Sequence, residues 1–321
     1  MASSLRRESS SFGKKALFFL FLIAAFVYLP VYISVYEVNQ SRKSFSTVSL
    51  VDQINIEDGE NVIKRFAAYG YNLDEIRKGK STVPNLFLKK LPRELTKLDD
   101  LKDKKRLFIE SLLPPILKVN QFIRYERSRL IEIMKSIELN GDASLDELYW
   151  LRRKMIRYRM DEFDINELYS RMNIIPPSLA LAQSAIETGW GTSRFAQDAN
   201  ALYGQWTWND EKGVVPLERE QGESHSIRKF NSLISAVESY ALNLNTHPAY
   251  KDFRMERSKF PSTDQIKVNE DLLFTLLYYS ELGFEYIDNL NNIMNSNNMR
   301  AFDKARLQKT PYEELRVTPE S

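Results

Sequence analysis

Residues 178–206 read SLALAQSAIETGWGTSRFAQDANALYGQW, and this stretch decides the fold that the sequence predicts. Ser178 is a favourable residue to cap a helix, which is expected over Leu179 to Thr188 and ends at Gly189. A glycine-rich, aromatic loop follows. Gly189 and Gly191 permit tight backbone turns, so a ligand can approach the end of this helix closely.

Glu187 is the candidate catalytic acid of this stretch. It lies near the predicted C-terminus of the helix, where the helix dipole disfavours additional negative charge. Trp190 and Phe195 are close enough in sequence to shield it from water. The residues that share its helix face, Gln183 among them, are small or uncharged, so no cation of this helix lowers its pKa. A carboxyl group with a raised pKa is suited to general acid catalysis. The alternative is a solvated surface glutamate, or one that is paired with Arg194.

Hydrophobic residues at helical spacing predict that the chain is mainly α. The other helices are expected at 108–119, interrupted by Pro114 and Pro115, and at 120–139, 145–160, 233–244 and 271–282. The pattern changes at about 206–231, where 213–216 and 226–230 are candidate strands. The sequence therefore predicts a helical body with a small β lobe, and a groove between them that suits a polymeric ligand.

The N-terminus carries a candidate membrane anchor. Residues 16–36 form an uncharged, apolar run that is long enough to span a bilayer, and four basic residues precede it. We expect residues 1–36 to be a basic cytoplasmic stretch and a single anchor, and 37–61 a polar linker. The alternatives are a signal peptide that is cleaved, for which no clear cleavage site is visible, and a buried core helix.

The composition disfavours several classes of function. A net charge of +2 over 321 residues gives no footprint for nucleic acid. The chain has no cysteine and only two histidines, His225 and His247, without the spacing of a zinc hydrolase. No GxSxG elbow is present. No metal and no organic cofactor are expected, and carboxylates and tyrosines are the main candidates for acid–base chemistry.

Three segments resemble the bacterial β-N-acetylglucosaminidase domains that cleave peptidoglycan, and within them the Bax-like proteins. These are ALAQSAIETGWGTSRFA at 180–196, NALYGQW at 200–206 and SAVESYALNLNTHPAYKDFR at 235–254. The likeness extends to the preceding residues 71–92 and 104–123. It implies a lysozyme-like α+β domain that hydrolyses the β-1,4 bond after N-acetylglucosamine, with Glu187 as the general acid.

The resemblance also implies the remaining site residues. Glu218 lies at about the offset of the family's second carboxylate, with Glu220 and Glu223 as alternatives to it, and without one the N-acetyl group of the substrate would assist. Tyr240 matches a family tyrosine in the groove, although its helical spacing also suits core packing. Substrate contacts are expected from four residues of the loop and from Gln183. The four are Asn200, Tyr203, Gln205 and Trp206. Trp190 is expected to pack beneath the loop.

The resulting prediction is a single-pass protein of the bacterial inner membrane with its catalytic domain in the periplasm, or released there after cleavage. A helical segment at 62–160 precedes the glucosaminidase domain at 161–308, and 309–321 form a tail. The expected partners are peptidoglycan glycan strands and, through residues 16–36, the inner membrane, with no nucleic acid. A lytic transglycosylase or muramidase on the same fold, and a non-catalytic scaffold that binds peptidoglycan, are the alternative functions.

Overall fold

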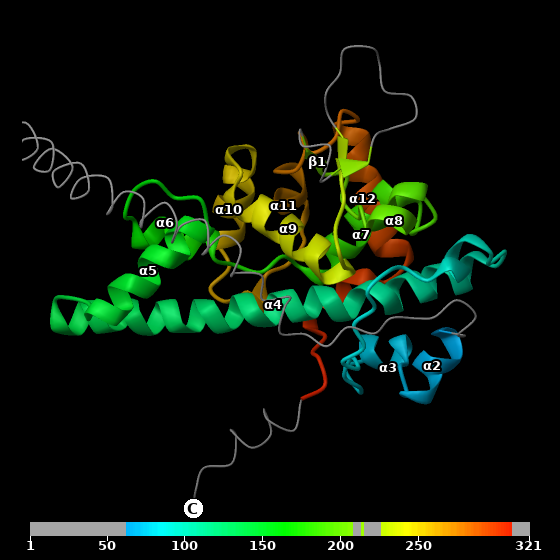
Figure 1. The fold of residues 1–321 in the computed structure, drawn as a ribbon, viewed down its shortest axis with the longest axis horizontal. Helices are drawn as coiled ribbons and strands as arrows, with labels where there is room; N and C mark the ends of the chain where they lie inside the picture. Colours follow the sequence, from blue (N-terminus) through cyan, green and yellow to red (C-terminus); the bar gives the residue numbers. More distant parts are fainter. Residues whose placement is uncertain (1–61, 208–212, 215–225, 310–321) are drawn as a thin grey trace, which may run out of the picture. The chain divides into compact units, whose positions relative to one another are not determined.

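The computed structural model describes residues 62–207, 213–214 and 226–309. They form a mainly α structure with one small sheet, as the sequence predicts (Figure 1). The helices are α2 (Val62–Ala68), α3 (Leu73–Arg77), η2 (Arg93–Thr96), α4 (Leu101–Asn140), α5 (Leu145–Arg157), α6 (Ile165–Arg171), α7 (Pro177–Thr188), α8 (Arg194–Ala199), α9 (Leu233–Thr246), η4 (Pro248–Tyr250), α10 (Lys251–Ser258), η5 (Thr263–Gln265), α11 (Glu270–Phe274), α12 (Phe284–Ser296) and η6 (Met299–Lys304). The predicted anchor at 16–36 and linker at 37–61 lie outside the described residues. Among those that are described, no helix combines the length and the apolar composition that crossing a bilayer requires.

The long helix α4 corrects the expectation of one helix at 108–119, interrupted at Pro114 and Pro115, and another at 120–139. It runs without interruption through both prolines. It begins where the side chain of Asp100 accepts hydrogen bonds from the first turn, and it ends at Gly141, which has a φ of 86°. Proline removes an intrahelical hydrogen bond, but the segment around both prolines is buried almost completely. Packing against α7 and α9 therefore outweighs the local preference for a break.

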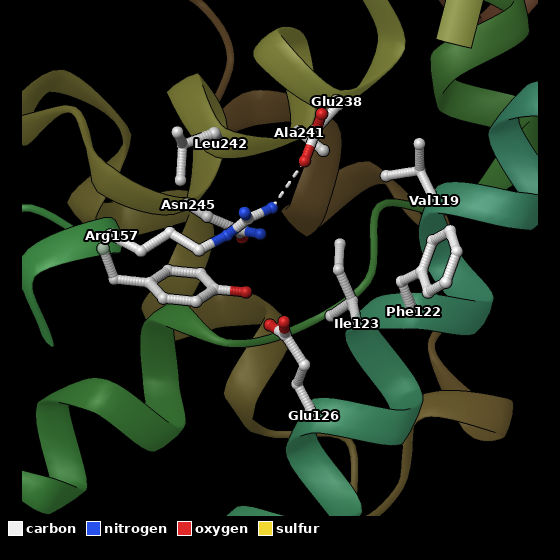
Figure 2. A pocket seen from close by; sticks show the side chains of 10 residues that line it. Val119, Phe122, Ile123, Glu126, Arg157, Glu238, Ala241, Leu242 and Asn245 are labelled. Atoms are coloured by element: carbon white, nitrogen blue, oxygen red, sulfur yellow. Dashed lines mark hydrogen bonds and ion pairs between the residues drawn. The ribbon is translucent and has the colours of Figure 1, made fainter. Parts of the chain in front are cut away.

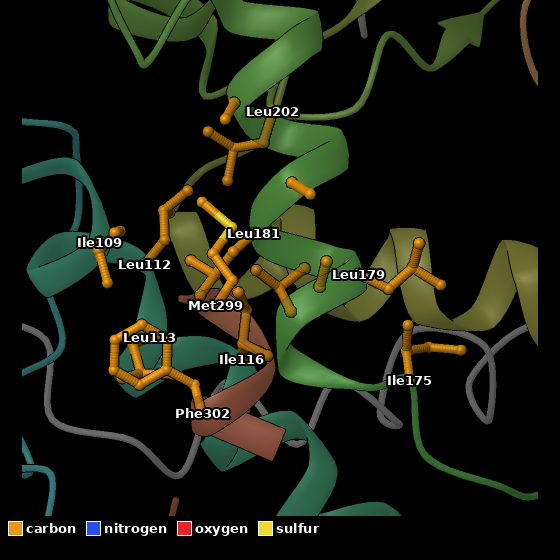
Figure 3. Close-up of a cluster of buried hydrophobic side chains, with 14 of the residues drawn as sticks. Ile109, Leu112, Leu113, Ile116, Ile175, Leu179, Leu181, Leu202, Met299 and Phe302 are labelled. Atoms are coloured by element: carbon orange, nitrogen blue, oxygen red, sulfur yellow. The ribbon is translucent and has the colours of Figure 1, made fainter. Parts of the chain in front are cut away.

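Helix α7, which carries Glu187, lies in the centre of the hydrophobic core. Figure 3 shows Leu179 and Leu181 of this helix among the apolar side chains of α4 and η6, including Leu112 and Phe302. Ser178 does not cap the helix, contrary to the sequence prediction, because the helix begins at Pro177, two residues before the predicted Leu179. The carboxylate of Asp303 in η6 accepts hydrogen bonds from the backbone amide and the hydroxyl of Ser178 instead. The predicted end of α7 at Gly189 is confirmed.

The small sheet has three antiparallel strands in the order β1-β3-β2. The strands are β1 (Trp206–Thr207), β2 (Gly213–Val214) and β3 (Ser226–Arg228). Trp206 pairs with Ile227, and Gly213 pairs with Arg228. Both predicted regions contain strand, at Gly213–Val214 and at Ser226–Arg228, and the second is shorter than the predicted 226–230. Strand β1 is not predicted, because two residues are too few to show an alternating pattern in the sequence.

The predicted helix at 271–282 is also corrected. Helix α11 ends at Phe274, and turns with hydrogen bonds between residues three apart follow it, such as that from the Tyr279 amide to the Leu276 carbonyl. Tyr278 is 90% exposed, so the apolar residues of this stretch do not share one buried face. Tyr279 is turned inward, where its hydroxyl donates to the carbonyl of Tyr203.

Helices α5 and α6 form a second, smaller core with one end of α4 (Figure 1). Ser144 and Glu147 make a capping box at the start of α5, which ends at Arg157 rather than at the predicted 160. Arg157 points toward Glu238 of α9 and pairs with it at 2.7 Å (Figure 2). This ion pair therefore joins α5 to α9.

The main core crosses the predicted boundary between residues 160 and 161. Side chains from α2 to the middle of α4 and side chains from 174 onward belong to the same buried cluster. Asn120 of α4 exchanges hydrogen bonds with the backbone of Ile175, and Val83 bridges to Leu307. The boundary stays a prediction, but the segment before it packs as part of the same body as the segment after it.

Candidate active site

The end of α7 presents Glu187 at a sharp turn. Gly189, Trp190 and Gly191 all have positive φ, of 55°, 58° and 80°. The Thr188 hydroxyl donates to the carbonyl of Ser184 and accepts from the amide of Gly191, so one side chain ties the turn to the helix. Glu187 is therefore carried by a rigid helix end and not by a free loop.

Side chains of η2 and α4 pack against this turn. The Trp190 ring packs edge-on against Phe108 of α4 at 5.6 Å, and the Lys105 ammonium lies 4.9 Å from its centroid. A β-carbon on Gly191 would come within 3.0 Å of side-chain atoms of both Leu95 and Phe108. Trp190 thus lies where the sequence analysis expects it, packed under the loop. Gly191 allows the loop and α4 to approach this closely.

The Glu187 carboxyl group has one open side and one that packs against protein. The residue as a whole is exposed, which leaves it accessible to a ligand. Its Oε2 atom, however, lies 3.0 Å from the place that a β-carbon on Gly204 would occupy. Burial of the packed side raises the pKa of Glu187 above its ordinary value. An exposed approach combined with a raised pKa is the combination that a general acid needs.

Gln183 and Tyr240 form a hydrogen bond in the protein interior, and Gln183 lies about one helical turn before Glu187 on α7. The Tyr240 hydroxyl donates to Gln183 Oε1 at 2.5 Å, and Gln183 Nε2 donates to the hydroxyl of Tyr286 at 2.9 Å. All three side chains are almost fully buried. Tyr203 is buried too, and its ring stacks on that of Tyr240 at 3.8 Å. These positions favour a supporting role over direct contact with a sugar for Gln183, Tyr203 and Tyr240, and their functional roles stay predictions.

The other loop residues differ in exposure. Asn200 is buried, takes a left-handed conformation at the end of α8, and donates to the carbonyl of Phe230 at 3.0 Å. Gln205 is half-buried and donates to the carbonyl of Ser239 at 3.4 Å. Trp206, at the start of β1, is 51% exposed. Of the expected substrate contacts, Trp206 therefore has the most open ring for stacking against a ligand.

Besides Tyr286, two further tyrosines that the sequence did not indicate lie close to Glu187. Its negative charge contributes to raising the pKa values of Tyr250 and Tyr279, after the larger effect of burial. Tyr250 is half-buried, and its ring lies 6.0 Å from that of Tyr279. Tyr250 belongs to the quoted segment 235–254 and could have been found there. Tyr279 lies in the misassigned helix, and nothing in its local pattern marks it.

The predicted second carboxylate is Glu218, and it lies outside the described residues together with its alternatives Glu220 and Glu223. Their separation from Glu187 is therefore not defined. The sheet brings β3, which follows these three glutamates in the sequence, against β1 and so beside the loop that holds Gly204. The role of Glu218 stays a prediction.

Two comparisons with known proteins find similar sequences. Residues 164–299 match the family model named Glucosaminidase, which is described as mannosyl-glycoprotein endo-beta-N-acetylglucosaminidase. The chain is also 31% identical over 189 residues to Protein bax of Escherichia coli strain K12. That similarity covers 57% of this chain and 66% of the length of the E. coli protein. No solved structure matches the chain. The family match contains Glu187, the loop and all five tyrosines described above.

Proposed function

The chain is a Bax-like protein with a glucosaminidase-family domain at 164–299, and we propose from this that it is a glycosidase acting on peptidoglycan. Its reaction in this proposal is hydrolysis of the β-1,4 bond after N-acetylglucosamine. The observation that carries the proposal is the Glu187 carboxyl group, which lies accessible at a fixed helix end with its pKa raised by burial. The combination of helices with a small sheet is consistent with a lysozyme-like domain.

Glu187 acts as the general acid in this proposal. It donates its proton to the leaving oxygen of the glycosidic bond while positive charge develops on the sugar ring. The proton has to be present before the bond breaks, and a raised pKa keeps a larger share of Glu187 protonated near neutral pH. The ionised form then takes a proton back from water or from the incoming nucleophile.

The partner of Glu187 is proposed to be Glu218, acting as base or nucleophile. It would have to come from the segment between β2 and β3 toward the open side of the Glu187 carboxyl group. Without such a carboxylate, the N-acetyl group of the substrate supplies the nucleophile. Trp206 is the proposed stacking surface for a sugar ring because its side chain is half exposed at the edge of the loop.

The location is proposed from the sequence alone. Residues 16–36 anchor the chain in the bacterial inner membrane, and the basic residues before them keep the N-terminus in the cytoplasm. The domain would then reach peptidoglycan in the periplasm, either tethered through 37–61 or released after cleavage. Protease protection of an N-terminal tag in intact spheroplasts, with the C-terminus accessible, is the expected result. The reverse pattern would contradict this orientation.

The experiment that tests the function is analysis of the products. The full-length chain is incubated with purified peptidoglycan, and the released fragments are reduced and identified by mass spectrometry. New reducing N-acetylglucosamine ends are expected, and the Glu187→Gln variant serves as the blank. Anhydromuramic acid ends would show a lytic transglycosylase, and reducing muramic acid ends a muramidase. Binding without any new ends over a broad pH range would show a scaffold. Each of these three outcomes overturns the proposed reaction.

A further inference from the structure

We propose that Gly204 is a positioning residue for Glu187, because its missing side chain provides the space in which the carboxylate lies. A β-carbon on Gly204 would be 3.0 Å from Glu187 Oε2 and 3.7 Å from Glu187 Cδ. The first separation is shorter than an ordinary contact between carbon and oxygen, so one of the two groups would have to move. The proposal rests on the proposed function, in which Glu187 is the acid.

The loop around Gly204 is held on both sides and cannot easily retreat. The ring of Tyr203 is buried and stacks on Tyr240 at 3.8 Å. The carbonyl of Gln205 accepts a hydrogen bond from the amide of Arg228 at 2.8 Å, which joins the loop to β3. The Glu187 carboxylate, in contrast, has an open side. A side chain at position 204 would therefore displace the carboxylate and not the loop.

Displacement of the carboxylate has a chemical consequence. A β-carbon on Gly204 would reach the carboxyl group, so this side of the group lies against the loop and is less open to water. A carboxylate that is pushed outward gains hydration, which stabilises its ionised form. It would then be less protonated near neutral pH and would point away from its present position. Close approach at Gly204 thus supports both the orientation and the protonation of Glu187.

Gly204 favours glycine for its backbone conformation as well as for its contact with Glu187, and a control variant has to separate these two effects. Its φ is +59°, which disfavours any residue with a β-carbon. Gly79, on the exposed turn after α3, has a similar φ of +70°, but a β-carbon there would meet no atom of the described residues within 4 Å. Gly79→Ala therefore reports the backbone strain alone, whereas Gly204→Ala adds the contact with Glu187.

Thermal unfolding of the full chain tests the contact without reference to activity. The variants are Gly204→Ala, Gly79→Ala and Glu187→Ala, with each glycine substitution also made in the Glu187→Ala background. Gly204→Ala is expected to lower the melting temperature by about 1–2 °C more than Gly79→Ala does, because the end of the Glu187 side chain can move by the small distance that the contact requires. This excess should disappear in the Glu187→Ala background. The proposal is overturned if the additional fall in melting temperature is the same in the wild-type and Glu187→Ala backgrounds, or if Gly204→Ala fails to fold in both. It is also overturned if Gly204→Ala and Gly79→Ala lower the melting temperature equally.

The pH profile of peptidoglycan cleavage tests positioning in the reaction. Activity of a general acid is lost as pH rises through its pKa. The alkaline limb of kcat/KM is therefore expected to move to lower pH in Gly204→Ala and to stay in place in Gly79→Ala. An unchanged limb with unchanged kcat in folded Gly204→Ala overturns the proposal. If Glu187→Gln retained full activity, the proposed function would fail, and the thermal comparison would still decide whether Gly204 positions the carboxylate.

Discussion

The Asp303 carboxylate accepts two hydrogen bonds from Ser178, one from its backbone amide and one from its hydroxyl, each 2.8 Å long. This contact joins η6 to the first turn of the helix that carries Glu187, across 125 positions of the chain. Pro176, which precedes the helix, offers no capping side chain. Asp303 therefore provides an acceptor for the backbone amide and for the hydroxyl of Ser178 at the buried start of α7.

Replacement of Asp303 by alanine is expected to destabilise the chain by about 1–2 kcal/mol, because it removes the cap of α7. Ser178→Ala removes only one of the two bonds and should cost about half as much. Urea denaturation followed by circular dichroism measures both changes. A free energy of unfolding for Asp303→Ala within about 0.3 kcal/mol of the wild type would contradict the role of the cap.

Replacement of Tyr240 by phenylalanine separates its two candidate roles. The change leaves Gln183 Oε1 without the 2.5 Å hydrogen bond in a buried environment, so we expect a loss of stability of about 1–2 kcal/mol. Peptidoglycan cleavage by the folded variant should fall by less than about tenfold, since the hydroxyl bonds inside the core. Tyr286→Phe, which removes the other partner of Gln183, is the matched control. A fall of about 100-fold or more with unchanged stability would instead assign Tyr240 to the chemistry.

Glu110 of α4 makes stability depend on pH. It is 5% exposed, and burial raises its pKa to about 7. The folded pKa lies above the ordinary value of 4.5, so the folded state holds its proton more tightly. Stability is therefore lost as pH rises from about 4.5 to about 7. Glu110→Gln should be more stable than the wild type by about 3 kcal/mol at high pH and equal to it at low pH. Denaturation curves that differ by the same amount at both extremes would contradict this.

The ion pair between Arg157 and Glu238 tests how α5 is attached to α9. Both side chains are 14% exposed and meet at 2.7 Å. Glu238→Ala removes this partner from a mostly buried guanidinium, on which the charge of Glu126 still acts, so a loss of about 2 kcal/mol is expected. The control is Glu75→Ala in the exposed pair with Lys78, where the loss should be below about 1 kcal/mol. Equal losses in the two variants would show that burial of the first pair has no energetic effect.

Local features of the site were predictable from the sequence, whereas long-range ones were not. The end of α7 at Gly189 and the position of Glu187 follow from neighbours in the chain. The cap from Asp303 and the partnership of Gln183 with Tyr240 and Tyr286 join residues that only the tertiary fold brings together. No periodic pattern encodes such pairs.

The errors of helix prediction have the same origin. Pro114 and Pro115 signal a break in any isolated segment, but burial on α7 and α9 keeps α4 continuous. Residues 275–282 have helical composition, yet Tyr279 stacks on Tyr286 in the interior whereas the neighbouring Tyr278 is exposed. Tertiary contacts therefore override the local preference in both segments. They keep α4 helical through Pro114 and Pro115, and they end α11 at Phe274.

The rate of peptidoglycan cleavage by Glu187→Gln is the measurement that tests the central claim most directly. Glutamine keeps the size of the side chain and removes the proton donor. We expect the initial rate of release of soluble fragments to fall by at least about 100-fold. The variant should unfold at nearly the wild-type temperature and should still sediment with insoluble peptidoglycan. A rate within a few-fold of the wild type, with the same products, would contradict the assignment of Glu187 as the catalytic acid.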